Sequence, residues 1–385
     1  MMKGIHLCFI TLLVKLWTFI DAFSLIKFEQ RISHVKSEEF QPRQTTRRYS
    51  GLNLNDVVNS SSGSKQDNND IYSRPSLYDL AFGYRDFEQE VDFLTYAHEK
   101  YSPSHKEPSS VLELAAGPAR HSLTALTGSD SVNYVHATAV DLSSEMKEYA
   151  LQLIKDEYLE KSTANSRSPL IILNDEEIRD NDRNTFKYLL QDMRSLHSAT
   201  HMHSSLFDTA WILLGSLQHL NTNQDVITCF KSIHDCLTQD GTLIIELPHP
   251  QEAFSMVECT RNTWEVPLEL SDNSSAKLSI LWGDDTDEFN PVTQVRDFSV
   301  RFDLFVDGKI STSLSQQVPT RLFTAQEMHA LAQCAGFEIA AMYGALDSDV
   351  SIMDYEQELA YRMVCVLRKR GDRAEKEKAF KSTLK

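Results

Sequence analysis

Short apolar runs separated by amphipathic stretches recur through the middle of the chain. These runs show no alternation of apolar and polar positions, which is typical of strands buried on both faces. They lie at residues 111–114, 134–140, 186–190, 207–214 and 242–247. The stretches between them have the spacing of helices with one apolar face. This order predicts an α/β fold in which helices cover both faces of a mostly parallel sheet.

The pattern changes between residues 264 and 320, where apolar and polar positions alternate with a period of two. The alternation is clearest at residues 277–282 and 295–306, and Asp307-Gly308 marks a turn. Such alternation predicts antiparallel strands with one solvated face. We therefore expect a small antiparallel β-insert at residues 264–320.

Helical and strand patterns return after this insert. Thr324 and Glu327 have the spacing of a capping box, which predicts a helix that ends at Gly336. Apolar runs at residues 337–343 and 362–368 then supply two last strands. The expected core covers residues 71–263 and 321–370, followed by a charged tail at 371–385.

The first part of the chain has the composition of a targeting segment. Lys3 precedes an apolar run at residues 5–14 and Ala22 is a small residue at its end, as in a signal peptide or a short anchor. Lys15 breaks the run, which is too short for a membrane span. We therefore expect no stable membrane span in the mature chain.

The junction Asp21-Ala22-Phe23-Ser24 resembles the Ala-Phe cleavage signature of bipartite plastid-targeting sequences from algae with complex plastids. The tract after it is rich in hydroxyl side chains. We expect residues 1–70 to direct the protein to a plastid and to end in a disordered linker at residues 50–70. The secretory pathway is the alternative.

Charge and cysteine usage exclude several classes of protein. The 385 residues carry a formal net charge of -17, and no stripe of Lys or Arg occurs outside the termini, so we expect no nucleic-acid partner. The six cysteines form no C-x-x-C pair, which argues against a disulfide scaffold and a zinc site. His197, His201 and His203 lie in a polar stretch and are expected to be surface residues rather than metal ligands. A small-molecule partner remains, and the oligomeric state is not indicated.

The first apolar run ends in an acid and small residues, in Glu113-Leu114-Ala115-Ala116-Gly117-Pro118-Ala119. Small residues at a strand-to-helix turn let the backbone approach a ligand closely. The glycine pattern of a dinucleotide site is incomplete, and a carboxylate at Glu113 would repel a diphosphate. A cofactor with a cationic centre and no phosphate fits better, and S-adenosylmethionine is one. We assign Glu113, Ala115 and Gly117 to cofactor binding.

Acids follow the next two strands as well. Asp141 ends the second strand roughly 20 residues beyond the turn, where an open α/β sheet places a carboxylate for both ribose hydroxyls; an N-cap role is the alternative. Leu142 follows it, and Met146 in the next helix can lie against a flat base. Asp192 and Met193, after the third strand, suit an adenine because a carboxylate accepts its exocyclic amine.

The acceptor side has fewer candidates. Leu214 ends the fourth strand and is expected to form the floor of the methyl-transfer point. Tyr78 and Arg85 belong to an aromatic-rich segment before the first strand and are candidates for a lid over the cofactor. His219 and His249 each follow a strand at the carboxyl edge and are candidate general bases, with a structural role as the alternative for each.

In their order along the chain, these features resemble the class I S-adenosylmethionine-dependent methyltransferases of the small-molecule type. The resemblance covers about residues 72–250 and the C-terminal segment, and departs at Ala115 and Ala119, where the family usually has glycine. It implies a Rossmann-like sheet of seven strands, S-adenosylmethionine as the cofactor, and transfer of its methyl group to a nitrogen or oxygen of a small molecule. Arg296 and Arg321 are candidates to clamp an acidic acceptor.

Two other functions remain open. An NAD-linked reductase uses the same kind of sheet, but its usual Tyr-x-x-x-Lys pair occurs only as Tyr96 with Lys100, ahead of the cofactor turn. A non-catalytic assembly or scaffold protein of methyltransferase fold would use the β-insert as a docking surface.

Overall fold

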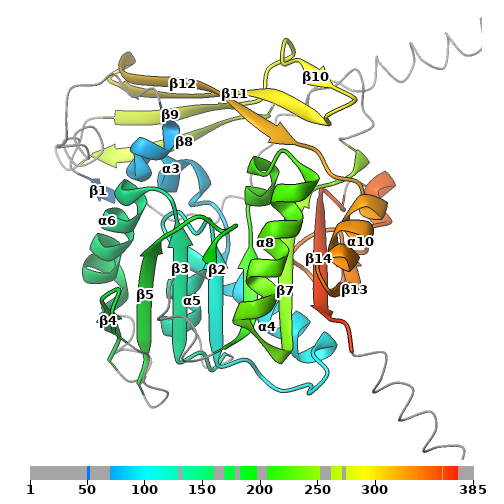
Figure 1. Ribbon diagram of the computed structural model, residues 1–385. Coiled ribbons are helices and arrows are strands. Elements are labelled where there is room, and N and C mark those ends of the chain that lie inside the picture. Colours follow the sequence, from blue (N-terminus) through cyan, green and yellow to red (C-terminus); the bar gives the residue numbers. More distant parts are fainter. Residues whose placement is uncertain are drawn as a thin grey trace, which may run out of the picture. The chain divides into compact units, whose positions relative to one another are not determined.

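The computed structural model describes the chain at residues 50–52, 70–128, 132–159, 169–177, 183–196, 206–251, 262–270, 275–357 and 359–371. These residues belong to one compact unit and form two β-sheets with helices packed on them (Figure 1). Residues 1–49 and 53–69 of the expected targeting segment, and the three histidines from 197 to 203, lie outside the described residues. Within them, no helix has both the length and the apolar character needed to cross a membrane.

The main sheet has the strand order β13-β14-β7-β6-β2-β3-β5-β4 within the described residues. Every neighbouring pair is parallel except those that involve β14, which is antiparallel to both β13 and β7. The strands are β2 (Ser110–Leu114), β3 (His136–Asp141), β4 (Ile171–Leu173), β5 (Thr185–Leu190), β6 (Phe207–Ile212), β7 (Leu237–Pro248), β13 (Phe337–Tyr343) and β14 (Arg362–Lys369). The predicted mostly parallel sheet is confirmed.

Two details of this sheet differ from the prediction. The seven expected strands gain an eighth, β4, at the edge, in a polar segment where three apolar residues are too few to show a period. Strand β7 begins at Leu237 and so includes residues 238–241, which carry a turn signature. A register shift opposite β6 accommodates these residues.

The register of the central strands determines where the site lies. Leu114 of β2 pairs with Val140 of β3 on one side and with Ile212 of β6 on the other. Because these strands are parallel, the segments that follow them leave the sheet at the same edge. The cofactor turn, Asp141 and Leu214 are thereby brought together.

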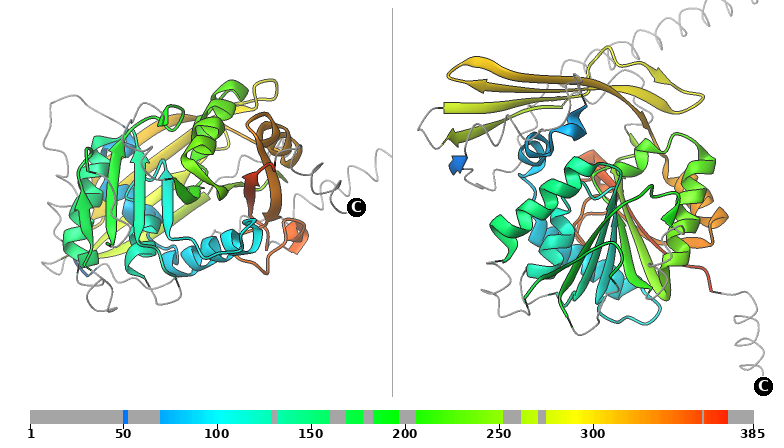
Figure 2. Two further views of the ribbon diagram at one scale, coloured as in Figure 1. Left: turned by 60° about the horizontal axis from the view of Figure 1, so that its bottom comes forward. Right: turned by 60° about the vertical axis from the view of Figure 1, so that its left-hand side comes forward.

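Helices cover both faces of the main sheet (Figure 2). One face packs against α4 (Phe87–Tyr101), α5 (Arg120–Thr127) and α6 (Ser144–Leu153), which continues as the π-helical turn η2 (Ile154–Tyr158). The other face packs against α8 (Asn223–Cys236) and α10 (Ala325–Cys334). The capping box of Thr324 and Glu327 is present at the start of α10, as its spacing predicted.

The second sheet is the predicted antiparallel insert. It contains β8 (Asn262–Leu270), β9 (Ser275–Trp282), β10 (Phe289–Asn290), β11 (Val295–Val306) and β12 (Lys309–Arg321), and β1 (Ser50–Leu52) pairs in parallel with β8. Residues 50–52 were expected to belong to a disordered linker. Apolar residues of one face, including Leu278 and Phe302, pack on Leu77 and Ala81 of α3 (Pro75–Phe82).

Candidate functional site

A cavity of about 590 Å³ lies at the carboxyl edge of the main sheet and is also walled by the second sheet. Its volume is in the range of roughly 300–1,000 Å³ that small-ligand pockets occupy. Most of the residues predicted from the sequence line it: Tyr78, Ala115, Gly117, Asp141, Leu142, Met146, Asp192, Met193, Leu214 and His219. The strand order gathers four of the segments that carry these side chains, and α3 adds Tyr78.

The cofactor turn has an unusual backbone. Ala115, Gly117 and Ala119 have φ values of 49°, 50° and 56°, in the left-handed region that side chains disfavour. Small residues are needed here because larger or branched side chains would add strain to this conformation. A Cβ at Gly117 would stand 3.9 Å from Sδ of Met146 and 4.0 Å from Cε1 of Tyr78. The missing side chain thus leaves open the space between these two residues.

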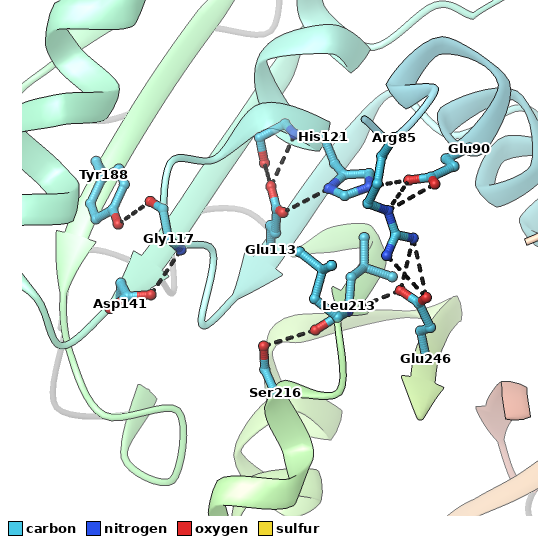
Figure 3. Close-up of polar contacts among 12 residues, drawn as sticks. Arg85, Glu90, Glu113, Gly117, His121, Asp141, Tyr188, Leu213, Ser216 and Glu246 are labelled. Atoms are coloured by element: carbon cyan, nitrogen blue, oxygen red, sulfur yellow. Dashed lines mark hydrogen bonds and ion pairs between the residues drawn. The ribbon is translucent and has the colours of Figure 1, made fainter. Parts of the chain in front are cut away.

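Asp141 fixes this turn from the neighbouring strand (Figure 3). Its Oδ2 accepts the N–H of Gly117 at 2.8 Å, and its Oδ1 accepts the N–H of Ser143 at 2.9 Å. The hydroxyl of Tyr188 in β5 donates to the carbonyl of Gly117 at 2.7 Å. Since a carboxylate offers roughly four lone-pair sites, Asp141 keeps acceptor capacity that faces the cavity.

At the other acidic position, the carboxylate is engaged with a cation. Asp192 accepts hydrogen bonds from Nε and Nη2 of Arg194 at 3.0 Å and 2.6 Å, and Arg194 also bonds Asp225 at 2.8 Å. The hydrogen bonds from Arg194 hold the pKa of Asp192 below its usual value. An adenine bound at this end would therefore contact Leu142, which is 74% exposed, and Met193 at least as much as the carboxylate of Asp192.

Tyr72 meets His219 in the lining of the same cavity. Tyr72 lies in η1 (Ile71–Ser73) and His219 ends η5 (Ser216–His219), and Oη of Tyr72 is 3.1 Å from Nε2 of His219. The ring of His219 is accessible from the cavity, yet the surrounding protein displaces enough water to lower its pKa. Burial also raises the pKa of Tyr72 well above its usual value. At neutral pH the pair is a neutral imidazole beside an intact phenol.

Three of the residues assigned to the cofactor, its lid or catalysis do not line this cavity, and neither do Arg296 and Arg321, the candidates for clamping an acidic acceptor. Glu113 lies beneath the turn, where it accepts the N–H and hydroxyl of Ser122 in α5. Arg85 is buried in ion pairs, so it does not act as a lid. His249 bonds the carbonyl of Ile352 at 3.0 Å instead of facing the acceptor region. The positions of these three residues in the sequence did not show that their polar side chains bond to other parts of the protein instead of facing the cavity.

Arg85 takes part in a buried network behind the cavity wall (Figure 3). It pairs with Glu246 at 3.1 Å and with Glu90 at 2.8 Å, and Arg362 approaches Glu246 at 3.3 Å. Burial would raise the pKa of Glu246, but the two arginines outweigh it and lower that pKa. The carboxylate also accepts the N–H of Leu214 at 2.9 Å. This network holds in place the loop between β6 and His219.

Sequence analysis missed several residues that line the cavity. Tyr72 comes at the start of the ordered core, where its aromatic ring could have been noticed beside Tyr78. Trp282, Phe298 and Val300 come from β9 and β11. Their alternation indicated a buried face but not what that face covers.

Comparison with known proteins identifies the fold. No family model matches the chain, and no curated protein matches it either. The sugar N-methyltransferase KedS8 from Streptoalloteichus is similar with a TM-score of 0.53 and 15% identity, over 81% of this chain and 97% of that one. An S-adenosylmethionine-dependent methyltransferase from Clostridium acetobutylicum has a TM-score of 0.52 and 15% identity, over 77% and 97%. DesVI from Streptomyces venezuelae has a TM-score of 0.50 and 16% identity, over 76% of this chain and 97% of that one.

The chain therefore has the fold of the class I S-adenosylmethionine-dependent methyltransferases, and the resemblance predicted from the sequence is confirmed at that level. A separate antiparallel sheet lies beside the main one. At 15% identity the likeness carries the fold and leaves the acceptor open.

Proposed function

We propose that this protein transfers the methyl group of S-adenosylmethionine to a nitrogen or oxygen of a small-molecule acceptor. The observation that carries the proposal is one cavity lined by a small-residue turn, by Asp141 and by the Tyr72–His219 pair. The methyltransferase fold supports it.

The cavity suits such a nucleoside. Asp141 has lone pairs left for ribose hydroxyls, and Leu142 and Met193 offer apolar surface to a base. Acidic side chains outnumber basic ones in the lining, which favours a sulfonium cation. They are Asp70, Asp141, Glu145, Asp192 and Asp225, against Arg194.

Bound S-adenosylmethionine would supply a methyl group that is already activated, so the protein has to align the acceptor and exclude water. Deprotonation of the acceptor falls to the Tyr72–His219 pair. A proton from the acceptor N–H or O–H moves to Oη of Tyr72 while the proton of Tyr72 moves to Nε2 of His219. The lowered pKa of His219 keeps its ring neutral, and in the tautomer with the proton on Nδ1 its Nε2 receives the proton.

Isothermal titration calorimetry with S-adenosylmethionine and S-adenosylhomocysteine tests the proposal. We expect binding by the wild type and roughly 10- to 100-fold weaker binding by Asp141→Asn, because charge-assisted hydrogen bonds to the ribose are lost. Asp175→Asn is the matched control, since that carboxylate is exposed and pairs with Lys147. No binding by the wild type, or equal binding by Asp141→Asn, would contradict the proposal.

Turnover is measured by incubating the protein with labelled cofactor and a cell extract. Transfer of label to a small compound identifies the acceptor. Cofactor binding without any transfer, together with a stoichiometric protein partner, would favour the scaffold alternative.

A further inference from the structure

Among the described residues, Arg296 of β11 is a buried cation that lacks an anionic partner. The residue is 4% exposed, and its Nε is buried without a hydrogen-bond partner. In the part of the chain that the structure describes, no carboxylate pairs with this guanidinium. Its contact is with the ring of Phe289, 5.5 Å from Cζ. A buried charge that is left unpaired destabilises a fold, so its presence needs a reason.

Arg321, a second buried arginine of the insert, has the carboxylate partner that Arg296 lacks among the described residues. It is also 4% exposed, but its guanidinium pairs with Glu327 and bonds Asn223. Its charge is thus neutralised within the protein. Arg296 and Arg321 were both predicted to bind an acidic acceptor. Of the two, only the guanidinium of Arg296 pairs with no carboxylate within the described residues.

The strand register places Arg296 beside the cavity. Residues two apart on a strand share a face, so Arg296 is on the same face of β11 as Phe298 and Val300, which line the cavity. Its partner across the strands is Thr320 of β12, which also lines it. Arg296 itself is not among the residues that line the cavity, but it is the next residue beyond Phe298 on that face of β11.

We propose that Arg296 binds an anionic group, a carboxylate or a phosphate, carried by the methyl acceptor. This inference rests on the proposed methyl transfer. A guanidinium presents its N–H donors in a fork that matches either anion, and pairing would remove the cost of the unpaired charge. The acceptor then has its nucleophile at Tyr72 and its anion at Arg296, with the apolar wall of Phe298 and Val300 between them.

Calorimetry on protein saturated with S-adenosylhomocysteine tests this with three probes: phenyl phosphate, phenylacetate and neutral phenylacetamide. We expect the wild type to bind at least one anionic probe roughly 10- to 100-fold more tightly than the amide. Arg296→Gln should abolish that preference. Arg301→Gln on the same strand should keep it, because its side chain is 53% exposed. The anionic probe that binds with the higher affinity shows whether the site prefers a phosphate or a carboxylate.

Thermal unfolding separates this role from a structural one. Inorganic phosphate should raise the Tm of the wild type but not that of Arg296→Gln, and without anions the variant should be at least as stable as the wild type. Equal affinity for anionic and neutral probes in the wild type would overturn the inference. So would a large loss of Tm in Arg296→Gln with an equal loss of affinity for all probes.

The same experiments keep the two proposals apart. Binding of S-adenosylhomocysteine without an Arg296-dependent anion preference overturns only the anion site. An Arg296-dependent preference measured without the nucleoside, in protein that fails to bind S-adenosylhomocysteine, supports an anion site and contradicts methyl transfer.

Discussion

Tyr72 and His219 are 147 positions apart in the chain, yet Oη of Tyr72 lies 3.1 Å from Nε2 of His219 and their rings meet edge to face. One comes from the turn before the first helix of the core, and the other comes from the loop after β6. Their meeting completes the acceptor side of the cavity. It also gives the clearest prediction about catalysis.

We predict that His219→Asn lowers kcat by roughly 10²- to 10⁴-fold with little change in the affinity for S-adenosylhomocysteine, because the proton loses its final acceptor. Tyr72→Phe should act in the same direction. His105→Asn is the control, since His105 lies on an exposed turn with φ of 51° that asparagine tolerates. Unchanged turnover in His219→Asn would rule out a base role.

The pH dependence of kcat/KM gives an independent test of the same pair. Burial lowers the pKa of His219, so the imidazole stays neutral until the pH falls below the ordinary value of about 6.5. Activity should therefore decline toward acid pH with an apparent pKa below that value. The decline should be absent from the residual activity of His219→Asn; an acidic limb at the ordinary value or above it would contradict the assignment.

Stability should depend on pH through His121. Burial alone would lower its pKa, but the hydrogen bonds that its ring donates to the carboxylates of Glu113 and Glu90 outweigh burial and raise the pKa to about 9. A raised pKa means that the folded state holds the proton more tightly. The stabilisation is complete below about pH 6.5 and is lost as the pH rises through about 9.

This linkage is worth on the order of 2–3 kcal/mol at pH 7. Urea denaturation at pH 7 and pH 9.5 measures it. The free energy of unfolding should fall between these values in the wild type and much less in His121→Gln. A wild type that is equally stable at both values would show that His121 is not a buried cation.

Removal of Arg85 should destabilise the protein strongly. Arg85→Met leaves the buried carboxylate of Glu246 with only the longer contact to Arg362, and breaking a buried pair costs about 3–5 kcal/mol. Lys277→Met breaks an exposed pair with Glu265 and should cost less than about 1 kcal/mol. Chemical denaturation compares the two. Similar losses would mean that the network around Glu246 adds nothing beyond a surface ion pair.

Gly117→Ala should weaken cofactor binding more than it destabilises the fold. The φ of 50° adds strain of roughly 1–2 kcal/mol for a residue with a Cβ. The new methyl group would also fill the space beside Met146 and Tyr78. Calorimetry with S-adenosylhomocysteine and thermal unfolding of the same samples test this. A drop in Tm with unchanged affinity would place the ligand away from the turn.

The targeting segment can be tested in cells. A reporter fused to residues 1–70 should enter the plastid of an alga with complex plastids, and changing Phe23 at the expected cleavage junction should stop import. Release into the medium would indicate secretion instead. A reporter that remains in the cytosol would remove the targeting prediction.

The sequence by itself determined the architecture and the cofactor side of the site. Apolar runs without alternation specify a sheet covered on both faces, and parallel strands bring their carboxyl ends to one edge. Ala115, Gly117 and Asp141 could therefore be assigned to one cavity from local order alone, since each lies at the carboxyl end of a strand or within three residues after it. The period-two segment likewise specified an antiparallel insert.

Tertiary structure decided the rest, because those contacts join segments that no local pattern relates. Glu113 and Arg85 lie in segments that were predicted to bind or cover the cofactor, but each side chain contacts a buried partner instead of the cavity. His219 faces the cavity and His249 does not, although both follow strands. Arg296 and Arg321 look alike in the sequence, and only the positions of Glu327 and Asn223 show which of them is neutralised. Which side chain satisfies which buried charge depends on packing in three dimensions, and the linear pattern does not encode it.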